Sequence, residues 1–351
     1  MLTKASENYI IVFVNVYFRE DNMKRSRFII LTACILLMIL ALASCKNGNG
    51  ADTQAETEYF TVTFDTQGGS EIEAMRIAKG GKIKEPTAPE RDGYVFDGWS
   101  FNSADWVFEA DTVTSDMTLI AKWINADTIY NIEALDNGVM ITEVKRTFDT
   151  MTVPSVIGGR PVIAIGDSVF AQFSVDNVQK ITVAESVKSV GSNAFKECAD
   201  IEIVIKGALT EIGEYAFYGC NMLSSVSFGE GLKTIPPQAF SGCSALTELV
   251  LPKSLELIDE NAFEDCSSVV TVIMHETTKS ISDGAFLGMD SLKAIYFYGT
   301  QNSFDTIEFA DGNDSFTDVA EDDMYFYSET EPTSSGKYWY FNDKGKIRIW
   351  K

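Results

Sequence analysis

A short apolar pattern recurs at nearly constant spacing through the second half of this 351-residue chain. At its centre is a phenylalanine, and successive copies are 25, 22, 23, 23 and 23 residues apart: Phe170, Phe195, Phe217, Phe240, Phe263 and Phe286. Three residues after four of these phenylalanines lies a cysteine: Cys198, Cys220, Cys243 and Cys266. A period of about 23 residues predicts a solenoid, in which each coil buries its apolar face by stacking on the next.

Each copy also contains a short apolar strand, and the whole pattern is nearly complete at residues 212–228, Ile-Gly-x-x-Ala-Phe-x-x-Cys-x-x-Leu-x-x-Val-x-Phe. This pattern resembles the leucine-rich repeats of bacterial surface protein A-like proteins. The resemblance implies repeats over residues 167–299, an N-terminal β cap over 125–166 and a C-terminal β cap over 300–351. Caps are physically required, because an open solenoid end exposes core residues and unpaired strand groups. The family includes adhesins and surface proteins that bind host proteins.

Residues 59–124 show the alternation of short strands, with Phe60, Val62 and Phe64 on one face and a Gly68-Gly69 turn after them. The motif Gly-Tyr-Val-Phe-Asp-Gly-Trp at 93–99 and the ending at 114–123 resemble the Listeria–Bacteroides repeat, also called the internalin B-repeat type. That resemblance implies a non-catalytic, β-grasp-like spacer or adhesion module. The chain as a whole is therefore expected to be mainly β: a small β-grasp-like module followed by a leucine-rich repeat solenoid with β caps.

Trp99 and Trp123 of this module allow two interpretations. Exposed indole rings could stack on sugar rings, whereas a module this small needs its large aromatic side chains for its own core. The second interpretation is favoured.

The start of the chain has the order of an export signal. Lys24, Arg25 and Arg27 precede an apolar run over residues 28–42, and Leu-Ala-Ser-Cys ends at Cys45. This ending resembles the lipobox of bacterial lipoproteins, which implies a signal peptide at 23–44 and lipid attachment at Cys45. Residues 1–22 are expected to be a mis-annotated upstream extension, and 45–58 a flexible tether. The protein is thus expected to be exported and lipid-anchored on the bacterial cell envelope, at the cell surface.

The formal net charge of −23 argues against nucleic acid as a partner, because phosphates would be repelled. The chain has one histidine, His275, which is expected to be a turn residue. The sequence therefore almost entirely lacks the residues needed for a catalytic triad or a multi-histidine metal site.

The cysteines fall one per coil and form a ladder rather than a metal cluster. Free thiols are favoured over disulfides between adjacent coils. Residues 311–323 are expected to be a solvated acidic loop and not a calcium site. No metal, cofactor or enzymatic activity is expected.

These observations favour an adhesin-like protein that binds an extracellular protein or glycan through the outward face of its repeats. The alternatives are a structural spacer without a specific ligand and, remotely, a glycan- or peptide-processing hydrolase. The candidate binding residues are the outward strand positions, with Tyr296 favoured because tyrosine is enriched at binding hot spots: Thr182, Ser225, Ser227, Glu248, Val250, Thr271, Ile273, Lys293 and Tyr296.

Overall fold

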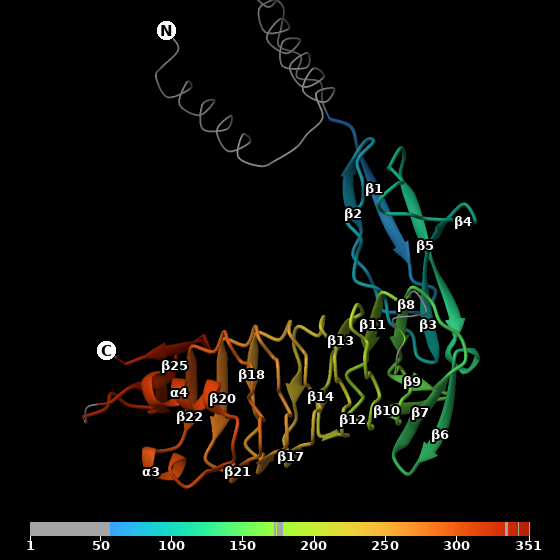
Figure 1. Ribbon diagram of the computed structural model, residues 1–351. Helices are drawn as coiled ribbons and strands as arrows, with labels where there is room; N and C mark the ends of the chain where they lie inside the picture. The colour runs from blue at the N-terminus through green and yellow to red at the C-terminus, as the bar shows by residue number, and fades with distance from the viewer. Residues whose placement is uncertain (1–56, 172, 174–177, 334–335, 343, 351) are drawn as a thin grey trace, which may run out of the picture. The chain divides into compact units, whose positions relative to one another are not determined.

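The computed structural model describes residues 57–171, 173, 178–333, 336–342 and 344–350 (Figure 1). Glu58–Lys351 form one compact unit. The expected upstream extension, signal peptide and lipid-attachment residue Cys45 lie outside the described residues. Among the helices that are described, none is long and apolar enough to cross a bilayer.

The first module is a five-stranded sheet in the order β2-β1-β5-β3-β4. Its strands are β1 (Tyr59–Asp65), β2 (Met75–Ala78), β3 (Tyr94–Phe101), β4 (Ala104–Asp105) and β5 (Met117–Asn125). β5 runs parallel to β1 and antiparallel to β3. Alternate side chains enter a small core, in which Val62, Leu119 and Trp99 are buried. The period-two pattern of the sequence thus forms a sheet with one apolar face.

A β cap follows and begins the solenoid. Its elements are η1 (Ala126–Thr128), β6 (Tyr130–Leu135), β7 (Gly138–Val144), β8 (Thr150–Val153), β9 (Val156–Ile157) and β10 (Arg160–Ile165). β6 and β7 form an antiparallel pair, and β7 continues in parallel to β10 and then to the first repeat strand, β12 (Ser189–Val190). The cap therefore pairs the backbone groups that the first coil would otherwise leave open.

Each coil contributes two short strands that pair in parallel with those of neighbouring coils (Figure 1). One series follows the cysteine position: β11 (Lys180–Val183), β13 (Glu202–Ile205), β16 (Ser227–Phe228), β18 (Glu248–Val250), β20 (Thr271–His275) and β22 (Ala294–Tyr298). The other precedes the phenylalanine: β12, β15 (Glu211–Ile212), β17 (Thr234–Ile235), β19 (Leu257–Ile258), β21 (Ser280–Ile281) and, beyond the last repeat, β23 (Glu308–Phe309).

The first of these series is divided into separate sheets. β8, β11 and β13 form the first repeat sheet, and β16 pairs with β14 (Ala208–Leu209) rather than with β13. The last repeat sheet has six strands in the order β18-β20-β22-β24-β25-β26, where β24 (Met324–Tyr327), β25 (Tyr338–Phe341) and β26 (Ile347–Ile349) follow the repeats. The division falls at the copy between Phe195 and Phe217, which is the shortest at 22 residues.

The repeated phenylalanines form a continuous stack in the core. Successive rings from Phe170 to Phe286 lie nearly parallel, with centroids 5.0, 5.2, 5.2, 5.4 and 5.9 Å apart. Phe316 continues the stack at 4.5 Å from Phe286, and all seven side chains are fully buried. One apolar position per coil therefore builds a core that extends along the solenoid.

The four repeat cysteines are free thiols in this core. Each thiol donates a hydrogen bond to the carbonyl of the phenylalanine one coil earlier, for example Cys220 Sγ to Phe195 O at 3.1 Å and Cys243 Sγ to Phe217 O at 3.2 Å. Burial raises the pKa of all four, to about 12 for Cys198 and Cys266. The favoured prediction of free thiols is confirmed, the alternative of disulfides between adjacent coils is not formed, and the protonated, buried thiols are unreactive.

The expected acidic loop at 311–323 is wrong, because most of it is helix α4 (Asp314–Asp323), which follows the short helix α3 (Gln301–Phe304). Phe316 anchors α4 in the core, and the buried Asn313 accepts a hydrogen bond from Phe286 N at 3.0 Å. The acidic side chains occupy the solvent side of an otherwise anchored helix. The C-terminal cap thus contains helices as well as the expected β strands.

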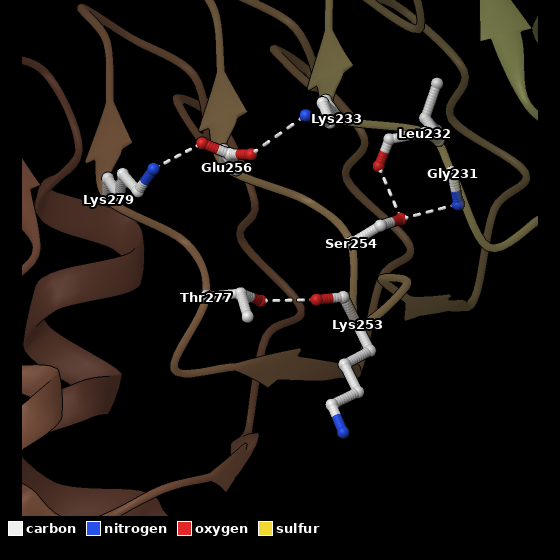
Figure 2. A network of polar contacts seen from close by, with 8 residues as sticks. All are labelled: Gly231, Leu232, Lys233, Lys253, Ser254, Glu256, Thr277 and Lys279. Atoms are coloured by element: carbon white, nitrogen blue, oxygen red, sulfur yellow. Dashed lines mark hydrogen bonds and ion pairs between the residues drawn. The ribbon is translucent and has the colours of Figure 1, made fainter.

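Polar side chains also join neighbouring coils at the surface (Figure 2). Ser254 Oγ accepts from Gly231 N at 2.9 Å and donates to Leu232 O at 2.8 Å. Glu256 lies between Lys279 and Lys233, which lower the pKa of its carboxyl. Such exposed ion pairs contribute little to stability. The predicted fold class, a small β module followed by a capped repeat solenoid, is confirmed.

Candidate ligand-binding face

Side chains alternate along the strands of the last repeat sheet, so every second residue points away from the core. Ile295 and Phe297 of β22 are fully buried, whereas Tyr296 and Tyr298 point outward and are half-buried. Parallel pairing places Tyr296 beside Tyr325 of β24, and Tyr298 beside His275 of β20. Outward side chains from different coils are therefore brought into rows.

Six of these outward side chains make a contiguous layer, here called the aromatic face: His275, Tyr296, Tyr298, Tyr325, Tyr327 and Trp339. His275 and Tyr298 stack at 4.3 Å with an angle of 4° between their rings. Tyr298 contacts Tyr327 at 4.7 Å, and Tyr296 stacks on Tyr325 at 5.4 Å. The layer crosses two coils and the cap.

Trp339 is the centre of the aromatic face. It pairs with Tyr327 in the β24–β25 register, so it lies on the outward side of the sheet, yet it is 0% exposed. Its ring meets those of Tyr298, Tyr327 and Tyr296 edge to face, at 4.7, 5.0 and 5.4 Å. Its Nε1 has no hydrogen-bond partner among the described residues. The outer side of the sheet therefore has a small apolar core of its own.

Burial favours the neutral forms of three side chains in the aromatic face, Tyr296, Tyr298 and His275. Burial raises the pKa of the Tyr296 and Tyr298 hydroxyls, and the neighbouring Tyr325 and Tyr327 add to this effect. Burial lowers the pKa of His275. The face thus offers ring edges and neutral hydroxyl groups, which suit binding rather than acid–base chemistry.

The structure distributes the expected binding residues over three sheets. Glu248, Val250, Thr271, Ile273, Lys293 and Tyr296 lie in or next to strands of the last repeat sheet. Thr182 is half-buried in the first repeat sheet, and the exposed Ser225 and Ser227 lie before and in β16.

Two expectations for individual residues change with the structure, and one is confirmed. Ile273 is 5% exposed, because it lies between Val250 and Tyr296 in the sheet, so it supports the face instead of contacting a ligand. His275 is the last residue of β20 and not a turn residue. Trp99 is 2% exposed, which confirms the favoured core interpretation for this residue, whereas the half-buried Trp123 packs against the same core and donates to Thr66 O at 3.0 Å.

Tyr298, Tyr325, Tyr327 and Trp339 were missed as candidates. Three aromatic triplets in the sequence could have indicated them: Tyr-Phe-Tyr at 296–298 and at 325–327, and Tyr-Trp-Tyr at 338–340. In a strand such a triplet places aromatic side chains on both faces. No cluster of three or more possible metal ligands occurs within the described residues.

Comparison with known proteins agrees with this architecture. The model of the BspA type leucine rich repeat region matches residues 144–269 and 201–315, in six copies. The model of the Listeria-Bacteroides repeat domain matches residues 60–122.

Curated relatives share only part of the chain. Internalin H of Listeria monocytogenes is 36% identical over 79 residues, which are 21% of this chain and 14% of that protein. A protein of Evansella cellulosilytica, named as a Gly-rich membrane protein, is 38% identical over 101 residues, 27% of this chain and 11% of its own length. The chain therefore spans a small fraction of the length of these relatives.

Two solved structures are similar to part of the chain. The T. pallidum leucine rich repeat protein is 25% identical with a TM-score of 0.45, and the match covers 52% of this chain and 84% of that one. A leucine rich cell surface protein from Faecalibacterium prausnitzii is 22% identical with a TM-score of 0.46, over 64% and 59% of the two chains. By its family matches, this chain contains BspA-type leucine-rich repeats and a Listeria-Bacteroides repeat domain.

Proposed function

We propose that this chain is a lipid-anchored, non-catalytic binding protein of the bacterial cell surface, which engages a protein ligand in the manner of an adhesin. The observation that carries the proposal is the aromatic face, an outward layer of tyrosines packed around the buried Trp339. Tyrosine and tryptophan are enriched among residues that dominate the energy of protein interfaces.

The arrangement of the rings favours a protein over a glycan as the ligand. Sugar rings stack on exposed flat faces, but the faces of Tyr298 and His275 are covered by each other, and Tyr296 stacks on Tyr325. This stacking leaves less flat ring surface for a sugar. Aromatic rings with hydroxyl groups fit the mixed apolar and hydrogen-bonding surface of a polypeptide.

The binding proposal is tested with the purified protein against a panel of extracellular-matrix proteins and glycans. Saturable binding to a protein is expected, and Tyr296→Ala and Tyr298→Ala should each weaken it at least about tenfold. Tyr218→Ala is the matched control, because this half-buried tyrosine lies in a turn outside the last repeat sheet and contacts Tyr215. Binding that survives both face variants would place recognition elsewhere, and no binding at all would favour a structural spacer.

The anchoring proposal is tested separately in cells that express the full chain. Metabolic labelling with an alkyne-tagged fatty acid should modify the protein, and Cys45→Ser should abolish the label. Cys34→Ser is the control, since this cysteine precedes Cys45 within the expected signal peptide. A label that persists in Cys45→Ser would contradict lipid attachment at that residue.

A further inference from the structure

A groove lies away from the aromatic face, where the first module packs on the cap. Val95 of the module belongs to the core of the repeats, and Gly93 N donates to Val156 O at 3.1 Å. The groove beside this contact has a volume of about 570 Å³, within the size range of small-molecule sites. One wall is the segment 85–91 together with Tyr94, and the other is the outward side of the first repeat sheet.

Arg91 is the one basic residue lining this groove that has no carboxylate partner among the described residues. Its guanidinium lies over the Tyr94 ring at 4.0 Å from the centroid, and 5.9 Å from that of Trp123. No carboxylate among the described residues pairs with it, because the adjacent Glu90 is bound to Lys206 at 2.5 Å. Stacking holds the planar group in place and leaves its N–H donors unpaired. Such a group binds a carboxylate through two parallel hydrogen bonds.

The opposite wall supplies hydroxyl groups. Thr152 of β8 pairs with Thr182 of β11, and Thr150 pairs with Lys180, so these four side chains point into the groove from neighbouring strands. Their three hydroxyls make no hydrogen bonds to the described residues, and Lys180 Nζ is 2.8 Å from Glu202. Unpartnered hydroxyls both donate and accept, as the hydroxyls of a sugar require.

The groove lacks the acidic excess of the chain as a whole. The groove is lined by three basic residues and two acidic ones: Arg91, Lys180, Lys206, Glu85 and Glu90. The chain as a whole has 28 basic and 51 acidic residues. A negatively charged ligand is therefore accommodated here in preference to most of the surface.

We propose that this groove binds a carboxylate-bearing sugar, with Arg91 holding the carboxylate and Thr150, Thr152 and Thr182 contacting the ring hydroxyls. A single carboxylate matches the one unpaired guanidinium, and the hydroxyl-rich wall distinguishes a sugar from an acidic peptide. The site is independent of the aromatic face, so one protein would carry a protein-binding surface and a separate acidic-glycan subsite.

The test is calorimetric titration of the purified full chain with D-glucuronate, D-glucose and a short glutamate-rich peptide. Saturable binding of glucuronate is expected, with glucose at least about tenfold weaker because it lacks the charge-assisted bonds. Arg91→Gln should weaken glucuronate about tenfold or more, and Arg91→Lys should weaken it less, since lysine keeps the charge but not the planar fork. Arg76→Gln is the matched control, because Arg76 lies over Tyr59 at 4.6 Å in the same module but does not line the groove.

Thr182→Val keeps the shape of the wall and removes one hydroxyl, so it tests the site even if Arg91 variants unfold; a loss of a few-fold is expected. Equal glucuronate affinity in Arg91→Gln, or no saturable glucuronate binding by the folded protein, would overturn the proposal. Tighter, Arg91-dependent binding of the peptide would overturn the assignment to a sugar. Tyr296→Ala should leave glucuronate binding unchanged, which separates this result from the test of the aromatic face.

Discussion

The first and last repeat sheets share one inward architecture and have different outward surfaces. Behind both, phenylalanines stack at 5.0 to 5.9 Å and cysteine thiols bond to carbonyls one coil away. On the outer side, the first sheet carries threonines and the Lys180–Glu202 ion pair, whereas the last carries tyrosines around Trp339. Stacking restrains every inward position, because each side chain meets its own counterpart in the next coil. Outward positions lack that restraint, so they are where binding specificity can differ.

The largest expected effect tests whether the inward architecture is truly shared. Phe195→Ala behind the first sheet and Phe263→Ala behind the last should each lower the free energy of unfolding by about 3–5 kcal/mol, because both rings are fully buried in the same stack. Urea unfolding followed by circular dichroism measures the loss. A cost below about 1 kcal/mol at one site alone would break the equivalence of the two regions.

The second-largest expected effect is a difference in stability cost between substitutions on the outward sides of the two sheets. Trp339→Ala removes a fully buried ring from the outer side of the last sheet and should cost about 3 kcal/mol. Thr182→Ala, at a half-buried outward position of the first sheet, should change stability by less than about 0.5 kcal/mol. The same urea titration applies, and similar costs for the two variants would remove the difference proposed between the sheets.

Alkaline pH should destabilise both regions through the cysteine ladder. Burial raises the folded pKa of Cys198 and Cys266 from 9.0 to about 12, so this contribution to stability is complete below pH 9 and is lost as pH rises toward 12. In that window only the unfolded thiol ionises, and stability falls by about 1.4 kcal/mol per pH unit for each thiol. Cys198→Ala and Cys266→Ala should flatten the pH dependence of urea midpoints equally. If the pH dependence of the urea midpoint stayed unchanged in either variant, the raised pKa assigned to that thiol would be wrong.

The smallest expected effect concerns the ion pair on the first sheet. Lys180 and Glu202 are 39% and 50% exposed in their side chains, so water and salt screen their attraction. Glu202→Gln should change the free energy of unfolding by less than about 0.5 kcal/mol. A substantially larger loss, especially one that persists at high salt, would show that the polar outer face also has a structural role.

Periodicity was sufficient to predict the solenoid and the side chains of its core. It was not sufficient for Phe316, the seventh ring of the stack, because 30 residues instead of about 23 separate it from Phe286. Most of the extra residues lie between β22 and β23, where α3 forms, and Asn313 then orients α4 by accepting from Phe286 N. A search for sequence repeats detects only residues at constant spacing. A phenylalanine ring can pack in the next layer of the core whatever its spacing along the chain.

The candidate site was predicted only in part for a related reason. Tyr296 was identified from its outward position, but its partners Tyr325 and Trp339 come from strands beyond the repeats, where no periodic position exists to compare. Their association depends on the β22–β24–β25 register. The buried state of Trp339 on an outward side could not be inferred from alternation, which predicts exposure there.

The sequence by itself determined which residues of this chain face inward, because identical positions stacked coil on coil must repeat along the chain. Only the tertiary structure decided which outward side chains meet. The aromatic face joins strands up to 64 residues apart, from His275 to Trp339, and the groove at Arg91 joins the first module to β8 and β11. Such contacts arise from register and packing between segments distant in sequence, and no local pattern encodes them.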